Sequence, residues 1–214
     1  MALRGSEYNR RTGCGKTACP GLCGGCRVTG IPTAEINTYW EESMNETLSV
    51  VEEKIKGVLE EVLKEDICKG GLGDAEWTIE LKSGLCKLGH DLDCGVCASG
   101  CRCADAGEWL FDLVWYKGGK NPDEFLSMHL AVEIEWSTAE NDIWDDFEKL
   151  LIAKADHRLF VFQQETRREI ETTISQMKDR IREFKSSFAG DRYLFAGYCC
   201  DHNQKRFIYD LFIV

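Results

Sequence analysis

Two carboxylates interrupt the apolar stretch HLAVEIEWS, residues 129–137. The stretch alternates as a β-strand does, and residues two apart in a strand point to the same side. Glu133 and Glu135 are therefore predicted to stand together, and Asp112 interrupts an earlier apolar stretch in the same way. An ionised carboxylate inside a sheet is costly unless it is paired or bound to a metal. Because Mg²⁺ prefers oxygen ligands and keeps waters for substrate phosphates, the three acids predict a cation site suited to phosphoryl chemistry.

The elements expected to position these acids alternate between helices and strands. Apolar residues at three- and four-residue intervals predict a helix over residues 34–67, which the Gly-rich run at 70–73 is expected to end. Strands are predicted at 75–82, 107–118, 129–137, 157–163, 192–200 and 206–214, with further helices at 141–156 and 165–187. This order indicates a mixed α/β fold. Because a helix joins the third and fourth of these strands, the two are expected to be parallel.

The first 32 residues are rich in Gly, Cys and Arg and lack apolar periodicity. We interpret residues 1–32 as a cysteine-rich leader and residues 33–214 as one domain, with a second cysteine-rich segment inserted at 83–107. A chain of 214 residues is long enough for one such domain with a sizeable core. The leader contains GCGKT, but a phosphate-binding loop requires Gly at the position that Arg10 occupies, so no nucleotide site is expected there.

The pattern of Asp112, twenty intervening residues and Glu133-Ile-Glu135 resembles the PD-(D/E)XK nuclease superfamily. The resemblance covers roughly residues 45–163 and implies a restriction-endonuclease-like α-β-β-β-α-β core, with a mixed central sheet flanked by helices. In that family the Asp and the first acid hold a metal ion, and a Lys two residues later positions or activates water. The resemblance thus implies hydrolysis of DNA phosphodiester bonds with Mg²⁺ or Mn²⁺, in which Asp112 and Glu133 hold the ion and Glu135 adds a ligand or orients water.

The sequence departs from the family pattern at two positions. Glu135 stands where the family has Lys, and Phe111 rather than Pro precedes the first acid. Some members take the basic residue from the following helix, where Lys149 and Lys154 are the candidates. Lys149 is favoured because it lies nearer the acidic strand, although Lys154 shares the apolar face of the expected helix.

Twelve cysteines form the other unusual feature of the composition. One group, in the leader, consists of Cys14, Cys19, Cys23 and Cys26. The second consists of Cys94, Cys97, Cys101 and Cys103, with Cys86 and His90 close by. Each group contains one Cys-x-x-Cys pair, a spacing that chelates zinc from a tight turn. A structural Zn²⁺ is predicted within the second group, or between the two pairs. An iron–sulfur cluster and unliganded, reduced thiols are the alternatives.

The charge leaves two further functions open. A net charge of −11 is awkward for binding DNA, and together with the missing Lys it favours an inactive nuclease relative that acts as a binding or scaffolding module. A zinc-dependent interaction protein is the third alternative. DNA is nevertheless the expected partner, and a homodimer or a protein partner is left open. No apolar run has the length of a membrane span, and the first residues lack an apolar signal core, so a cytoplasmic protein without membrane contact is expected.

Overall fold

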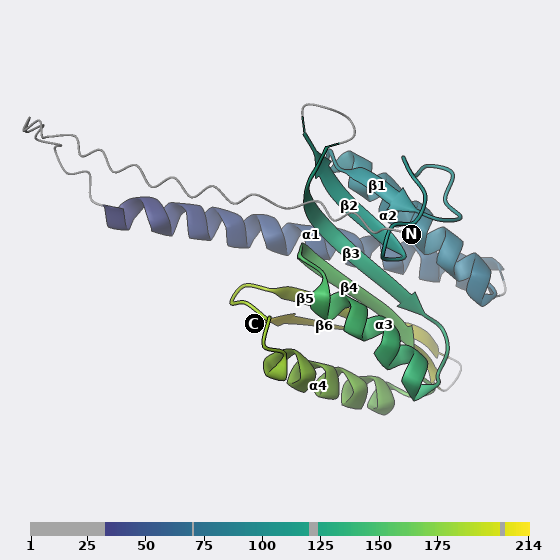
Figure 1. The fold of residues 1–214 in the computed structure, drawn as a ribbon. Helices are drawn as coiled ribbons and strands as arrows, with labels where there is room; N and C mark the ends of the chain where they lie inside the picture. The colour runs from purple at the N-terminus through teal and green to yellow at the C-terminus, as the bar shows by residue number, and fades with distance from the viewer. Residues whose placement is uncertain (1–32, 70, 120–123, 202–203) are drawn as a thin grey trace, which may run out of the picture. The chain divides into compact units, whose positions relative to one another are not determined.

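The computed structural model describes residues 33–69, 71–119, 124–201 and 204–214, with side chains from residue 50 onward apart from residue 69 (Figure 1). The chain divides into two compact units, Met1–Glu41 and Glu42–Val214. All the strands described here belong to the second unit. The predicted leader at 1–32, with its group of four cysteines, lies outside the described residues.

Six strands form one mixed sheet, in which each strand pairs with its neighbours in chain order. The elements are α1 (Thr33–Lys69), α2 (Asp74–Asp91), β1 (Gly95–Ala98), β2 (Leu113–Gly118), β3 (Phe125–Glu135), α3 (Glu140–Ile152), β4 (Ala155–Gln163), α4 (Arg167–Glu183), β5 (Arg192–Asp201) and β6 (Gln204–Ile213). The predicted α/β class is confirmed. The expected parallel pairing of β3 with β4 is also found; β4 and β5 are parallel as well, and the other pairs are antiparallel.

The sheet separates two apolar cores, one on each face. Residues of α1 and α2 pack against one face, which includes Leu113 and Val132. Residues of α3 and α4 pack against the other, which includes Val114 and Ala131. Because side chains alternate along a strand, Glu133 and Glu135 follow Ala131 onto the face that α3 and α4 cover. Pairs of helices thus sandwich the sheet, and the two glutamates point toward the α3 side.

The strand predicted at 75–82 is wrong, because this stretch begins helix α2. Trp77 and Leu81 satisfy a two-residue alternation, but Leu85 continues them at four-residue spacing and all three are buried. Ile79, which a strand would place beside Trp77 and Leu81, is exposed instead. The carboxylate of Glu76 accepts a hydrogen bond from the backbone N–H of Gly73 at 3.0 Å, which fixes the start of the helix. The four-residue spacing of the buried side chains, which extends to Leu85, therefore indicates the structure of this stretch better than the short two-residue alternation.

Helix α2 also takes up residues 83–91 of the predicted 83–107 insertion, where glycines favoured a loop. Two of these glycines are places of close packing. A side chain on Gly84 would lie 2.5 Å from Cγ1 of Val58 in α1, and one on Gly89 would lie 2.6 Å from Nε1 of Trp115 in β2. Gly at these positions lets the helix approach both neighbours, so the composition that suggested a loop serves a packed helix. No helix in the described ranges is long and apolar enough to cross a membrane.

Candidate active site

The acidic residues singled out from the sequence meet where β2 begins beside the end of β3. Leu113 pairs with Val132 in the antiparallel register, which puts Asp112 at the position next to Glu133. Oδ2 of Asp112 accepts a hydrogen bond from the backbone N–H of Ile134 at 2.9 Å. Asp112 is thereby fastened to the strand that carries the two glutamates.

Glu133 is the most constrained of these carboxylates. Its side chain is 2% exposed, and its Oε1 is buried with no hydrogen-bond partner among the described residues. Oε2 lies 3.3 Å from Nζ of Lys149. Burial, and next the negative charge of Asp112, raise the pKa of Glu133 to about 8 despite the nearby Lys149. A carboxylate held in this way gains from any cation that reaches its free oxygen.

Glu135 points to the same side of β3 and pairs with an acid that the sequence reasoning missed. Burial raises the pKa of Glu135, and a hydrogen bond shared with Asp146 of α3 raises it further. The backbone N–H of Ser137 donates to Oε1 of Glu135 at 2.5 Å. Asp146 precedes Lys149 by three residues, so the two share a face of α3. This spacing was the signal that could have identified Asp146.

The structure brings Lys149, and not Lys154, to the acidic cluster. Nζ of Lys149 donates to Oδ1 of Asp146 at 2.5 Å and contacts Glu133. Partial burial acts to lower the pKa of Lys149, but Asp146 and Glu133 outweigh it and raise that pKa above its ordinary value. Helix α3 ends at Ile152, so Lys154 lies beyond the helix and does not share its apolar face. The expected helix at 141–156 was too long by one turn.

A second lysine, which the sequence reasoning did not identify, holds Asp112. Lys82 of α2 is buried, and its Nζ lies 2.8 Å from Oδ1 of Asp112 and 3.4 Å from Oε2 of Glu108. Glu108 also accepts a hydrogen bond from Oγ of Ser99 at 2.5 Å. Because residues 75–82 were interpreted as a strand, no helix was available to carry Lys82 toward the acids.

The resulting arrangement consists of two ion-paired groups that bring Asp112 and Glu133 next to each other. Lys82 pairs with Asp112, and Lys149 lies between Glu133 and Asp146. In the described ranges, no three acidic residues have one carboxylate oxygen each within 4.8 Å of one another. Cation binding at these acids would therefore require Lys149 or Lys82 to turn aside. Half of the Lys149 side chain is exposed, so Lys149 has room to move.

The cysteines are grouped differently from the predicted zinc set. Cys101 and Cys103 lie together with Cys86, and the three sulfurs are within 4.8 Å of one another. Cys94 is buried, with its thiol directed at the carbonyl of Leu92 at 3.7 Å. Cys97 packs against the core on the opposite face of the sheet from Cys86. The sheet thus separates Cys97 from the other thiols of the predicted set.

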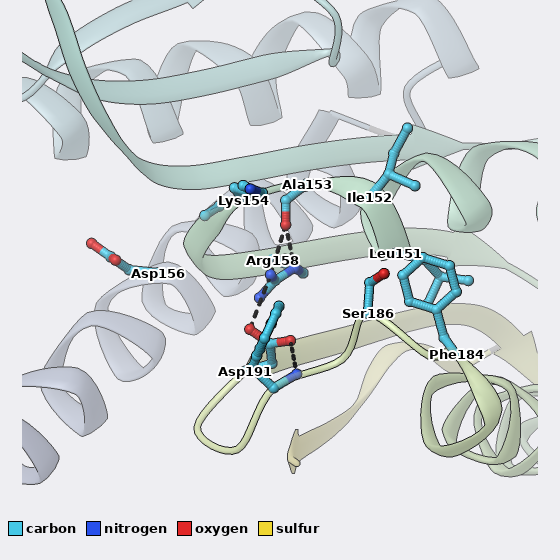
Figure 2. A pocket seen from close by; sticks show the side chains of 11 residues that line it. Leu151, Ile152, Ala153, Lys154, Asp156, Arg158, Phe184, Ser186 and Asp191 are labelled. Atoms are coloured by element: carbon cyan, nitrogen blue, oxygen red, sulfur yellow. Dashed lines mark hydrogen bonds and ion pairs between the residues drawn. The ribbon is translucent and has the colours of Figure 1, made fainter. Parts of the chain in front are cut away.

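A cavity of about 500 Å³ lies where α3 ends and β4 begins, beside the segment that follows α4 (Figure 2). Lys154 lines this cavity, and the buried guanidinium of Arg158 forms part of its wall. Nε and Nη2 of Arg158 donate to the carbonyl of Ala153 at 3.1 and 2.6 Å, and Nη2 lies 3.2 Å from Oδ1 of Asp191. The cavity shares no lining residue with the acidic cluster, so we treat the two as separate features.

No family model, curated protein or solved structure matches this chain.

Proposed function

We propose that the chain is a metal-dependent endonuclease that hydrolyses DNA phosphodiester bonds on a restriction-endonuclease-like core. The order α2, β1, β2, β3, α3, β4 and the parallel pairing of β3 with β4 are compatible with the α-β-β-β-α-β arrangement. This core starts at α2 rather than at α1, because the predicted first strand is helical. Asp112 then immediately precedes the second strand of this core, and Glu133 and Glu135 lie in the third.

The observation that carries the proposal is the buried carboxylate of Glu133. An acid with a pKa near 8 and a free buried oxygen lowers the stability of the fold at neutral pH. Such a cost is typical of a site that is completed by a ligand. The donor atoms nearby are carboxylate oxygens, which suit Mg²⁺ or Mn²⁺. Glu133 and Asp112 are the residues that would hold the ion, with Glu135 or Asp146 beside them.

Each residue has a distinct role in this proposal. When bound, the Mg²⁺ ion supplies positive charge for the phosphoryl transition state. Glu135 and Asp146 accept hydrogen bonds and orient the attacking water. One of these carboxylates takes a proton from the water as its oxygen bonds to phosphorus, and the leaving oxygen, released as its bond to phosphorus breaks, takes a proton from solvent. Lys149, displaced from Glu133, donates to a phosphate oxygen and stabilises its negative charge. Lys149 thus replaces the Lys that the family pattern places at position 135.

The direct test is incubation of the full-length chain with supercoiled plasmid and Mg²⁺ or Mn²⁺, with EDTA as the metal-free control. Nicked or linear product that requires the metal supports the proposal. Absence of cleavage with either ion, at any concentration at which the chain is folded, contradicts it.

Two lysines provide a matched pair of variants for locating the site. Lys149→Ala should reduce the cleavage rate by about 100-fold, because it removes a donor near the transferred phosphoryl group. Lys154→Ala should leave the rate within about twofold of the wild type, since Lys154 lines the separate cavity. Initial rates of plasmid nicking measure both. Equal losses in the two variants would remove Lys149 from the site.

A catalytically inactive nuclease-fold protein that binds a partner is the second candidate function. It is favoured by the lysines that already neutralise Asp112 and Glu133 and by the net charge of −11. In this case Lys149 replaces the cation permanently. The chain would then bind no Mg²⁺ at millimolar concentration, which isothermal titration calorimetry on the wild type and on Lys149→Ala would measure.

A further inference from the structure

Three thiols that no step of the proposed hydrolysis uses meet beside α2. Cys86 lies on α2 and is fully buried, whereas Cys101 and Cys103 come from the segment between β1 and β2 and are partly buried. Sγ of Cys101 and Sγ of Cys103 are 2.8 Å apart, and all three sulfurs lie within 4.8 Å of one another. We call these residues the thiol triad.

The spacing of the thiol triad suits a single tetrahedral ion. Zinc–sulfur bonds of about 2.3 Å in a tetrahedron place the sulfurs about 3.8 Å apart. The triad needs only shifts of about an ångström to reach this separation. Beyond each other, the triad thiols contact Ser83: its carbonyl lies 3.9 Å from Sγ of Cys103, and its side chain hydrogen-bonds with Cys101. No other set of three Cys, His, Asp or Glu residues in the described ranges has its ligand atoms this close.

We propose that Cys86, Cys101 and Cys103 bind one Zn²⁺ ion as thiolates, with the fourth position taken by water. Cys94 and Cys97, which the sequence pattern placed in the same site, are not ligands. The Cys-x-x-Cys pair therefore does not supply the ligands. They are instead Cys86 of helix α2 and the Cys-x-Cys pair Cys101 and Cys103 of the segment between β1 and β2. The ion is zinc rather than Mg²⁺, because thiolates are soft ligands.

The ion has a defined structural consequence for the acidic cluster. Cys86 and Lys82 are four residues apart on α2 and share one face, and Lys82 contacts both Asp112 and Glu108. With zinc bound at the thiol triad, the segment from Cys101 to Asp112 would be attached to α2 at a second point, in addition to the contacts of Lys82. Zinc binding itself does not depend on whether the acids cleave DNA, so the two proposals fail or succeed separately.

The experiment measures bound metal in the full-length chain. Cys14, Cys19, Cys23 and Cys26 are first replaced by Ser, because these leader cysteines form a second group that is able to bind zinc. The protein is purified with reductant, incubated with ZnCl₂ and freed of unbound ion, and its zinc is counted by mass spectrometry. In this background Cys86→Ser, Cys101→Ser and Cys103→Ser are each compared with the controls Cys94→Ser and Cys97→Ser.

The expected result is one zinc per chain in the background protein and in both controls, and loss of that zinc in each of the three triad variants. Cobalt should give the red-region absorption of a tetrahedral thiolate site in the same pattern. Cys86→Ser could fail to fold because Cys86 is fully buried. In that case the proposal is tested by Cys103→Ser, whose side chain is only partly buried, and by the cobalt spectrum of the background protein.

Three outcomes would overturn the proposal. The first is a background protein that binds neither zinc nor cobalt under reducing conditions. The second is loss of zinc in Cys94→Ser or Cys97→Ser with retention in the triad variants. The third is stoichiometric iron with acid-labile sulfide in place of zinc, which would indicate an iron–sulfur cluster.

Discussion

Glu133→Gln should abolish Mg²⁺-dependent cleavage and at the same time make the folded chain more stable at neutral pH. The loss of cleavage follows because the amide removes the negative charge that holds the cation. We expect the rate to fall by about 1,000-fold or more, comparable to the loss of a key electrostatic group in other enzymes. The gain in stability follows from the pKa of Glu133.

The sign of the stability change is set by the direction of the pKa shift. The pKa of Glu133 is raised from 4.5 to about 8 in the folded chain. Between these values the unfolded chain loses its proton first, so the carboxyl group destabilises the fold increasingly as the pH rises from 4.5 to 8. Gln carries no charge at any pH and avoids this cost. At pH 7 the variant should therefore be more stable by about 2 kcal/mol, allowing for the unpaired amide that Gln introduces.

The measurement is urea unfolding of the wild type and of Glu133→Gln at several pH values, with and without Mg²⁺. The advantage of the variant should be largest toward pH 8 and shrink as the pH falls. Near pH 4.5 the variant should be the less stable of the two, because only the cost of its unpaired amide remains. Mg²⁺ should stabilise the wild type and leave the variant unchanged. Glu148→Gln is the matched control, since Glu148 is an exposed residue of α3 whose nearest cation, Arg180, is 3.9 Å away. Glu148→Gln should change neither the rate of DNA cleavage nor the stability measured by urea unfolding.

Two results would contradict the role of Glu133. Cleavage that survives Glu133→Gln would remove the acidic cluster as the active site, whatever the stability shows. A variant that is less stable than the wild type at pH 7 would mean that Glu133 is a satisfied structural carboxylate. If stability rises but neither protein cleaves DNA or responds to Mg²⁺, the inactive binding protein becomes the better description.

The sequence alone predicted the parts of the site that lie on one strand, and missed those that depend on packing. Alternation along β3 correctly placed Glu133 and Glu135 on a common side, since a strand has one local period. Asp146 and Lys82 reach the cluster from two helices on opposite faces of the sheet. Which helix faces which strand is decided by the core, through contacts such as Trp77, Leu81 and Leu85 against the sheet. Local spacing does not contain this information.

The cysteines also show that local spacing does not predict which side chains meet in the folded chain. Cys-x-x-Cys is a reliable local signal only when both residues lie in one turn. Here Cys97 is part of β1 and Cys94 precedes it, and the alternation of the strand directs Cys97 away from the face on which Cys86 lies. The spacing of Cys94 and Cys97 favoured a zinc-binding turn, but the strand that contains Cys97 places these two thiols apart. The sequence placed Cys86 near the second cysteine group, but its contact with Cys101 and Cys103 depends on the packing of helix α2.

The largest loss of stability is expected from Glu52→Ala, far along the chain from the acids. Glu52 of α1 is 2% exposed, and Arg192 of β5 donates to both of its oxygens, from Nε at 2.7 Å and from Nη2 at 3.0 Å. Nδ1 of His157 in β4 donates to Oε1 at 2.8 Å. This triad fastens α1 to the middle of the sheet. Removing the acid leaves a buried guanidinium without its partner, which costs about 3–5 kcal/mol.

The ion-paired group of Glu52, His157 and Arg192 predicts that stability falls as the pH is lowered, which is opposite to the effect of Glu133. Burial acts to raise the pKa of Glu52, but the hydrogen bonds from His157 and Arg192 outweigh it and lower that pKa from 4.5 to about 2. The stabilisation is therefore complete above pH 4.5 and is lost as the pH falls toward 2. Urea unfolding between pH 2 and 7 should show this loss in the wild type and a flatter profile in Glu52→Gln. Glu53→Ala, at an exposed neighbour on α1, is the control and should change stability by less than about 1 kcal/mol.

A double variant separates the cost of the unpaired arginine from the contribution of the pair itself. Replacing Glu52 and Arg192 together by Met removes both charges and keeps apolar contacts between α1 and β5. Because a buried ion pair is often matched by apolar side chains of similar volume, this double variant should be more stable than Glu52→Ala. If it is no better, neither the unpaired guanidinium nor the missing volume accounts for the loss in Glu52→Ala, and the lost hydrogen bond from His157 is the remaining cause. The order of the three unfolding free energies thus decides whether apolar side chains at positions 52 and 192 are able to replace the buried ion pair.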